Sequence, residues 1–275
     1  MIKKVIIFGS GYHGRNALRA CRKKKIEVLF FVDNNIKLNN KLILGKKVYS
    51  PNIIKNTNFD YIILCGKHIN SIKRQIIELK VNKKKFLFWG KKELKLDKVN
   101  LKKRSAQLIK ILKIIIYNFK KYKIKYWLDM GSLLYLLRNQ DLAETSDVDF
   151  ILDYKDLSQL ENICKKIASS NKKLILHRKF LYKSRYFKKK IKQISFTGVS
   201  KSFDFEPPIF EFNLFIKNKN LIENLAKEKL FNSNYCSKQV YKFYKNIPIP
   251  IPYNSKKYLS DMYGKDWRVK KNFFS

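Results

Sequence analysis

The sequence is poor in the residues that form cross-links or ligate zinc. It contains 4 cysteines and 3 histidines among 275 residues. They form no CxxC pair and no histidine cluster, and they lie at Cys21, Cys65, Cys164, Cys236, His13, His68 and His177. This spacing argues against a zinc site and a disulfide framework and predicts reduced cysteines that pack in the core.

Long apolar runs are also lacking. The most apolar stretch, residues 108–119, is interrupted by Lys110 and Lys113 and is shorter than the roughly 20 residues that a membrane-spanning helix needs. The first residues run directly into a glycine turn and show no signal-peptide pattern. We therefore expect a cytoplasmic protein.

Acidic residues are scarce, with 21 Asp and Glu against 61 Lys and Arg and a formal net charge of +40. Such an excess favours nucleic acid, anionic lipid or a phosphorylated substrate as partner. The lysines are spread along the whole chain, however, so a compositional bias toward lysine explains most of the excess. Because no helix-turn-helix, RNA-binding or finger motif is present, nucleic acid is not the expected partner. Peripheral attachment to the anionic inner face of the cell membrane remains a hypothesis.

With 45% apolar residues the chain can bury a core, and it divides into two segments by pattern. In the first, residues 1–97, a short apolar run at 4–8 leads into a glycine turn and a helix from Arg15 to about Lys23. The alternation continues, with strands expected at 26–32, 47–51, 61–66 and 86–90 and a helix at 70–79. Strands that alternate with helices predict a parallel sheet, here a Rossmann-like α/β domain.

The glycine turn of this domain has the spacing of a phosphate-binding loop. Gly9 permits the turn, Gly11 lets the backbone approach a phosphate, and Gly14 allows the helix to pack closely on the strand. Asp33 follows at the distance of a ribose-binding carboxylate. The pattern predicts a nucleotide or nucleotide-sugar site, although a turn kept for structure alone is the alternative.

These residues resemble the small nucleotide-sugar-binding domains that precede bacterial sugar acetyltransferases. The resemblance covers about the first third of the chain. No acetyltransferase hexapeptide repeat follows, so the activity of those enzymes is not implied.

A charged stretch at residues 91–103 lacks strand patterning and predicts a linker. Apolar residues then recur at helical spacing from Leu108 to Phe119, with lysines between them. We expect this helix to cover the sheet of the second domain. A basic amphipathic helix on an anionic membrane is the alternative.

The strongest signal is a Gly-Ser turn followed by a DxD sequence on a strand. Residues two apart on a strand share a face, so Asp147 and Asp149 project together. Two adjacent negative charges need a cation, which predicts Mg²⁺ or Mn²⁺. Backbone N–H groups at Gly131 and the hydroxyl of Ser132 would hold phosphate oxygens opposite the metal.

A third metal carboxylate is expected from a neighbouring strand. The candidates are Asp204, Glu206 and Glu211. Pro207 and Pro208 interrupt the strand pattern around the first two, whereas Glu211 lies in an uninterrupted aromatic-rich strand. We therefore favour Glu211.

The second segment, residues 98–275, resembles the LicD/fukutin family of nucleotidyltransferase-like enzymes over about residues 105–275. The matching segments, in family order, are 129–138, 146–149, 194–198, 210–215 and 247–267. Two features depart from the family: Ala143-Glu144-Thr145-Ser146 replaces a Trp- and Asp-containing stretch common in bacterial members, and the third acid is Glu where Asp is commoner. The resemblance implies an α+β nucleotidyltransferase-fold domain.

The resemblance also implies transfer of a phosphorylated alcohol, such as phosphocholine or ribitol phosphate, from a CDP-linked donor to a hydroxyl of a glycan or lipid-linked glycan. Asp147, Asp149 and Glu211 would hold the metal, and Arg138 is a candidate phosphate clamp. Three further residues would border the nucleotide or form a packed C-terminal cap: Tyr263, Lys265 and Trp267. A nucleotidyltransferase that moves NMP from an NTP to a small molecule or RNA is the alternative.

Overall fold

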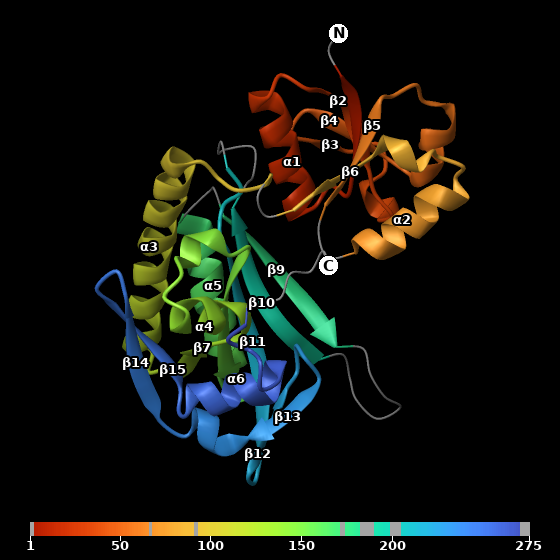
Figure 1. Cartoon of the computed structure of the whole chain (residues 1–275). Coiled ribbons are helices and arrows are strands. Elements are labelled where there is room, and N and C mark those ends of the chain that lie inside the picture. The colour runs from red at the N-terminus through yellow and green to blue at the C-terminus, as the bar shows by residue number, and fades with distance from the viewer. Residues whose placement is uncertain are drawn as a thin grey trace. The chain divides into compact units, whose positions relative to one another are not determined.

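The computed structural model describes residues 3–65, 68–90, 93–170, 174–181, 190–198 and 205–269, and Asp204 lies outside this part of the chain. The described chain is α/β and forms two compact units, which are shown in Figure 1. The first unit contains the residues up to Asn100 together with Phe205 and Glu206, and the second contains most of the chain from Leu101 onward. None of the described helices is long and apolar enough to cross a membrane.

The first unit is built on a six-stranded sheet in the order β3-β4-β2-β1-β5-β6, parallel except for the β3–β4 pair. Its strands are β1 (Lys4–Phe8), β2 (Glu27–Val32), β3 (Leu42–Ile43), β4 (Lys46–Tyr49), β5 (Tyr61–Cys65) and β6 (Phe86–Trp89). Its helices are α1 (Tyr12–Lys23) and α2 (Ile69–Glu78). The expected alternation of strands and helices around a parallel sheet is confirmed.

Both faces of this sheet are buried, which explains the uninterrupted apolar sequence of β1. Val5 and Ile7 enter one hydrophobic core with Leu18 of α1. Ile6 and Phe8 enter a second core that includes Ile76 of α2. Strands covered on both faces are apolar at every position instead of every second one.

The conformation of the glycine turn between β1 and α1 depends on Gly9, Gly14 and Asp33. Gly9 has a φ of +92°, and a Cβ on Gly14 would lie 1.8 Å from the Gly9 carbonyl oxygen, so neither position suits a larger residue. Asp33 closes the turn from β2, because its carboxylate accepts hydrogen bonds from the Ser10 amide at 2.8 Å and the Ser10 hydroxyl at 2.7 Å.

Glu206 belongs to the first unit although it follows residue 200 in the sequence. Its carboxylate is 2% exposed and forms ion pairs with two arginines of α1, with Arg15 Nε at 2.7 Å and with Arg19. A buried carboxylate needs such partners. Glu206 was one of the candidates for the third metal carboxylate, and in the structure it is used in this ion-pair cluster.

The second unit contains a seven-stranded mixed sheet whose centre is the parallel pair β8–β11. β7 pairs antiparallel with β8, and β10 pairs antiparallel with both β11 and β9. The strands are β7 (Tyr126–Leu128), β8 (Asp147–Asp153), β9 (Leu174–Leu181), β10 (Lys190–Gly198), β11 (Ile209–Asn218), β12 (Leu221–Asn224) and β13 (Lys229–Asn232). A separate hairpin consists of β14 (Gln239–Tyr244) and β15 (Ile247–Pro252).

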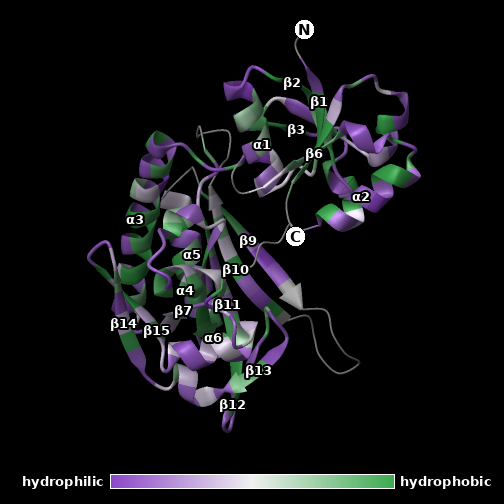
Figure 2. Ribbon diagram, in the orientation of Figure 1, coloured by the Kyte–Doolittle hydropathy of each residue, from purple (hydrophilic) through white to green (hydrophobic). Residues whose placement is uncertain are grey.

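The helices of this unit are α3 (Lys98–Lys121), α4 (Met130–Leu137), α5 (Leu157–Ser170) and α6 (Ser255–Tyr263). α3 packs on the sheet through the face that begins at Leu108, and the Phe119 ring meets that of Phe212 in β11 at 5.7 Å between centroids. This confirms the expected role of the apolar stripe. Figure 2 shows the stripe as hydrophobic segments alternating with hydrophilic ones along α3.

The expected linker at 91–103 extends too far, since α3 already begins at Lys98 and residues 98–103 are helical. Asp97 caps the helix, and its carboxylate accepts a hydrogen bond from the Asn100 amide at 2.7 Å. An acidic residue at this position stabilises a helix N-terminus. The charged composition concealed the helix because this end of α3 lacks the apolar stripe of its later turns.

Arg104 of α3 supports the segment that leads into β8. Its side chain is completely buried. The guanidinium donates hydrogen bonds to the backbone carbonyls of Ala143, of Thr145 at 2.6 Å and of Ser146 at 3.3 Å. The fork geometry of arginine allows one side chain to serve all three carbonyls and so to fix the start of β8.

We expect Gly14→Ala to destabilise the first unit by about 1–3 kcal/mol, because the new methyl group overlaps the Gly9 carbonyl. Gly11→Ala is the matched control, since a Cβ there meets nothing within 4 Å, and it should cost about 1 kcal/mol or less. Hydrogen exchange of peptides from β1 and α1 in increasing urea measures both. Equal effects of the two substitutions would contradict this account of the turn.

We expect Arg104→Met to lower the free energy of unfolding of the second unit by roughly 2–3 kcal/mol, because buried carbonyls lose a charged donor. Arg178→Met removes a more exposed ion pair with Glu161 and should cost less than about 1 kcal/mol. Urea denaturation followed by circular dichroism compares the two. A loss at Arg104 no larger than at Arg178 would show that the loop does not need this support.

Candidate functional site

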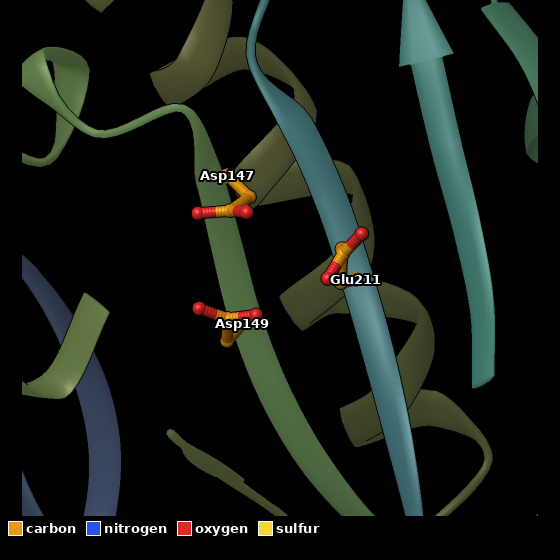
Figure 3. A group of neighbouring side chains, drawn as sticks. All are labelled: Asp147, Asp149 and Glu211. Atoms are coloured by element: carbon orange, nitrogen blue, oxygen red, sulfur yellow. The ribbon is translucent and has the colours of Figure 1, made fainter. Parts of the chain in front are cut away.

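Three carboxylates lie together on one face of the central sheet of the second unit. Asp147 and Asp149 are two residues apart on β8, and Glu211 on β11 is the direct register partner of Asp149. One ligand oxygen from each of the three lies within 4.8 Å of the others. Figure 3 shows the side chains rising from two adjacent strands, as the sequence predicted for the DxD and the third acid.

The opposite face of the same strands is hydrophobic. Val148 and Phe150 of β8 and Phe212 of β11 are completely buried in the core. The Phe150 and Phe212 rings stack at 5.9 Å between centroids. The alternation of acid and apolar residues therefore fixes the register, because a slip by one residue would place the acids in the core.

Like charges at this distance repel, and burial adds to the cost. Asp149 is only 4% exposed. Burial, followed by the negative charges of Asp147 and Glu211, raises its pKa well above the usual range, while Lys227 opposes the shift. A divalent cation would relieve this cost. A donor set made only of carboxylate oxygens fits Mg²⁺ or Mn²⁺ and does not resemble a zinc site.

Ser132 of α4 anchors the DxD strand. Its side chain is completely buried, and its hydroxyl oxygen accepts a hydrogen bond from the Asp149 amide at 2.9 Å. The same hydroxyl lies 3.2 Å from the Asp147 carbonyl oxygen. Its neighbour Gly131 has open space around it, since a Cβ there would meet nothing within 4 Å. Ser132 thus holds the strand of the two aspartates in place, and the space around the Gly131 Cα is open.

Asp129 is a fourth acid next to the cluster, and no separate role is predicted for it from the sequence. It is completely buried, and its carboxylate accepts hydrogen bonds from the Met130 amide at 2.7 Å and the Tyr258 hydroxyl at 2.6 Å. Asn224 lies at 3.4 Å from its other oxygen. Burial raises the pKa of Asp129, and these hydrogen bonds counteract the increase. Through Tyr258, Asp129 connects α6 to the start of α4.

Glu211 is held by two residues that sequence reasoning missed. Gln193 of β10 donates from Nε2 to Glu211 Oε2 at 2.8 Å and to Asn213 Oδ1 at 2.6 Å. Lys179 of β9 places its ammonium 3.2 Å from Glu211 Oε1. The signal that could have found them is strand register, which aligns Lys179, Gln193 and Asn213 across three strands.

The structure uses Arg138 and Trp267 for packing around the C-terminal segment. The Arg138 guanidinium donates to the backbone carbonyls of Trp267 and, at 3.1 Å, of Val269. The Trp267 ring is buried in the core of the unit, while Lys265 is exposed. Burial raises the pKa of the Tyr263 hydroxyl, and the charges of Asp129, Asp149 and Asp147 add to the shift. Among the three residues expected to border the nucleotide, Tyr263 is the one whose hydroxyl pKa is raised by the negative charges of these aspartates.

The residues expected to bind a nucleotide in the first unit lie at the β1–α1 turn. Gly9 and Gly14 form the tight part of the turn, and Gly11 has open space around it. Asp33 already accepts hydrogen bonds from Ser10 and from the Asn35 amide at 2.9 Å. The structure brings the four together and gives Asp33 a clear role in closing the turn.

Comparison with known solved structures finds related folds at low similarity. The lincosamide antibiotic adenylyltransferase LnuA, in its lincomycin-bound crystal structure, is 16% identical with a TM-score of 0.36, over 60% of this chain and 89% of that one. ANT(2")-Ia in complex with adenylyl-2"-tobramycin is 9% identical with a TM-score of 0.35, over 56% and 77%. UDP-D-quinovosamine 4-dehydrogenase from Vibrio fischeri is 19% identical with a TM-score of 0.27, over 33% and 78%. Scores this low carry no information about function.

Two family matches cover separate parts of the sequence, whereas no curated protein matches it significantly. Residues 1–87 match the family described as C2185-like, N-terminal. Residues 123–254 match the LicD/FKTN/FKRP nucleotidyltransferase domain, and this range contains Asp147, Asp149 and Glu211. The chain thus carries a C2185-like N-terminal domain followed by a LicD family domain, which implies a transferase.

Proposed function

We propose that the protein transfers a phosphorylated alcohol, of the phosphocholine or ribitol phosphate kind, from a CDP-linked donor to a hydroxyl of a cell-surface glycan in a metal-dependent reaction. The observation that carries the proposal is the group of three carboxylates within 4.8 Å on one sheet face, inside the range matched by the LicD domain. Such a group can hold a divalent metal, and a metal beside a phosphate-binding turn is what phosphoryl transfer requires.

In this proposal Asp147, Asp149 and Glu211 would hold Mg²⁺ or Mn²⁺. When bound, the metal would supply charge neutralisation for the donor's diphosphate and for the leaving CMP. Gly131, beside the carboxylates, leaves space for the phosphate oxygens to approach the backbone at the start of α4. Ser132 and Arg104 keep the carboxylates in position.

The chemical step forms a bond between the acceptor oxygen and the phosphorus of the alcohol phosphate and breaks the bond from that phosphorus to the oxygen of CMP. The acceptor hydroxyl loses its proton, which one carboxylate of the cluster takes up. CMP leaves with the electron pair of the broken bond. The protein supplies position and charge compensation and forms no covalent intermediate in this scheme.

For the first unit we propose a Rossmann-like domain whose glycine turn can receive the phosphate of a nucleotide or nucleotide sugar. The parallel strand order, the turn at Gly9 and the open space at Gly11 support this proposal. The hydrogen bonds from Ser10 to Asp33 leave less of that carboxylate for a ribose.

We expect Asp147→Asn and Asp149→Asn each to abolish stabilisation by Mg²⁺ while leaving the metal-free protein as stable as the wild type or more so. Each removes one of three repelling charges, and a gain of about 1 kcal/mol would raise Tm by roughly 2–4 °C. Thermal unfolding with Mg²⁺ or with a chelator measures both effects. Asp153→Asn, at the other end of β8, is the matched control and should keep the wild-type response to Mg²⁺. A normal Mg²⁺ response in the Asp149 variant would refute the metal site.

We expect calorimetry to show CDP binding that requires Mg²⁺ and is lost in the Asp147→Ala/Asp149→Ala double variant, because both aspartates would hold the metal that contacts the diphosphate. CTP, UDP and NAD are the comparison ligands. Turnover of a CDP-alcohol to CMP would support the proposed reaction, whereas release of pyrophosphate from CTP would favour NMP transfer. Binding of UDP or NAD alone, unchanged in the double variant, would place the ligand in the first unit and count against the proposal.

A further inference from the structure

Lys179 occupies an unusual position at the edge of the carboxylate cluster. It lies on β9, and its ammonium is 3.2 Å from Glu211 Oε1. The other oxygen of Glu211 accepts the hydrogen bond from Gln193. The Glu211 side chain is 16% exposed, whereas that of Lys179 is 55% exposed. The lysine therefore reaches the cluster from solvent and can leave it without uncovering the core.

The ammonium and a metal ion compete for the same carboxylate. A metal ligated at about 2.1 Å by Oε1, which is 3.2 Å from the Lys179 nitrogen, would lie within roughly 5 Å of the ammonium. Two cations at this distance repel each other, and the lysine is the mobile one because its stem has four flexible carbons. Metal binding would thus weaken the pair between Lys179 and Glu211.

A displaced Lys179 would find its next anionic partner on the substrate. The diphosphate of the proposed donor would contact the metal and so lie beside the cluster. An ammonium on a flexible stem is a common point-charge ligand for phosphate. Lys227, which follows β12 in the sequence, also acts on the cluster. Its positive charge acts on Asp149 and Asp129.

We propose that Lys179 neutralises Glu211 in the metal-free protein and, when the divalent metal binds, moves to the diphosphate of the donor as a phosphate-binding residue. This inference rests on the proposed function. It assigns one side chain two successive anionic partners, the first in the protein and the second in the substrate.

The test compares wild type, Lys179→Met and Lys155→Met. Methionine keeps the length of the side chain and removes its charge. Lys155 is the matched control because it is exposed and pairs with Asp153 at 3.6 Å, outside the carboxylate cluster. The probes are Mn²⁺ alone, titrated by calorimetry and electron paramagnetic resonance, and then inorganic pyrophosphate, CDP and cytidine, titrated in the presence of Mg²⁺.

The expected result for Lys179→Met is Mn²⁺ affinity increased by about twofold to fivefold, because a competing cation is removed. Affinity for pyrophosphate and for CDP should fall by about tenfold, while affinity for cytidine stays the same. Lys155→Met should match the wild type for every probe.

Unchanged Mn²⁺ affinity, or unchanged pyrophosphate affinity, in Lys179→Met would overturn the inference and leave the metal site intact. A wild-type protein that binds no Mn²⁺ would overturn the proposed function and, with it, this inference.

Discussion

The in-register parallel pairing of β8 with β11 is the constraint on which the rest of the second unit depends. It places Asp149 opposite Glu211 and, two residues along β8, Asp147 on the same face. The other face of both strands is aromatic and aliphatic and is covered by α3. The free energy of burying that face opposes the repulsion between the acids, because each large apolar side chain contributes about 1.5–3 kcal/mol when it is fully buried.

Several neighbouring helices and strands supply polar contacts that stabilise the acids in and around the cluster. Ser132 fixes the backbone of β8, Gln193 orients Glu211, and Tyr258 satisfies the buried Asp129. Each contact comes from a different strand or helix. Buried charges of this kind are tolerated where every oxygen has a donor, and the elements that supply the donors must then keep their places. The site and the fold of the second unit are therefore mutually dependent.

The sequence predicted those features that follow from local periodicity. The strand of two aspartates, the apolar stripe after Leu108 and the glycine turn at Gly9 each have a pattern within about ten residues, and the elements formed as expected. Glu211 could be chosen over Glu206 because prolines interrupt one segment and leave the other intact.

Other features depend on contacts between residues distant in the sequence and have no local pattern. Lys179 reaches Glu211 only because β9, β10 and β11 align, and Arg104 supports a segment about 40 residues further along the chain. Both look like ordinary surface cations in a chain with 61 Lys and Arg. The start of α3 at Lys98 could not be predicted for a related reason. The capping residue Asp97 is present in the sequence, but the first turns of the helix lack the apolar stripe by which a helix is recognised.

The position of Glu206 affects how the protein can be dissected. This residue lies five positions before Glu211, yet it belongs to the compact unit formed by the first 100 residues. A gene fragment that starts at Lys98 would encode all three acids of the cluster. It would also encode Glu206, whose carboxylate would then lack its ion-pair partners Arg15 and Arg19. Separate expression of the two halves therefore calls for Glu206→Gln in the C-terminal fragment, so that this position no longer carries a charge without a counter-ion.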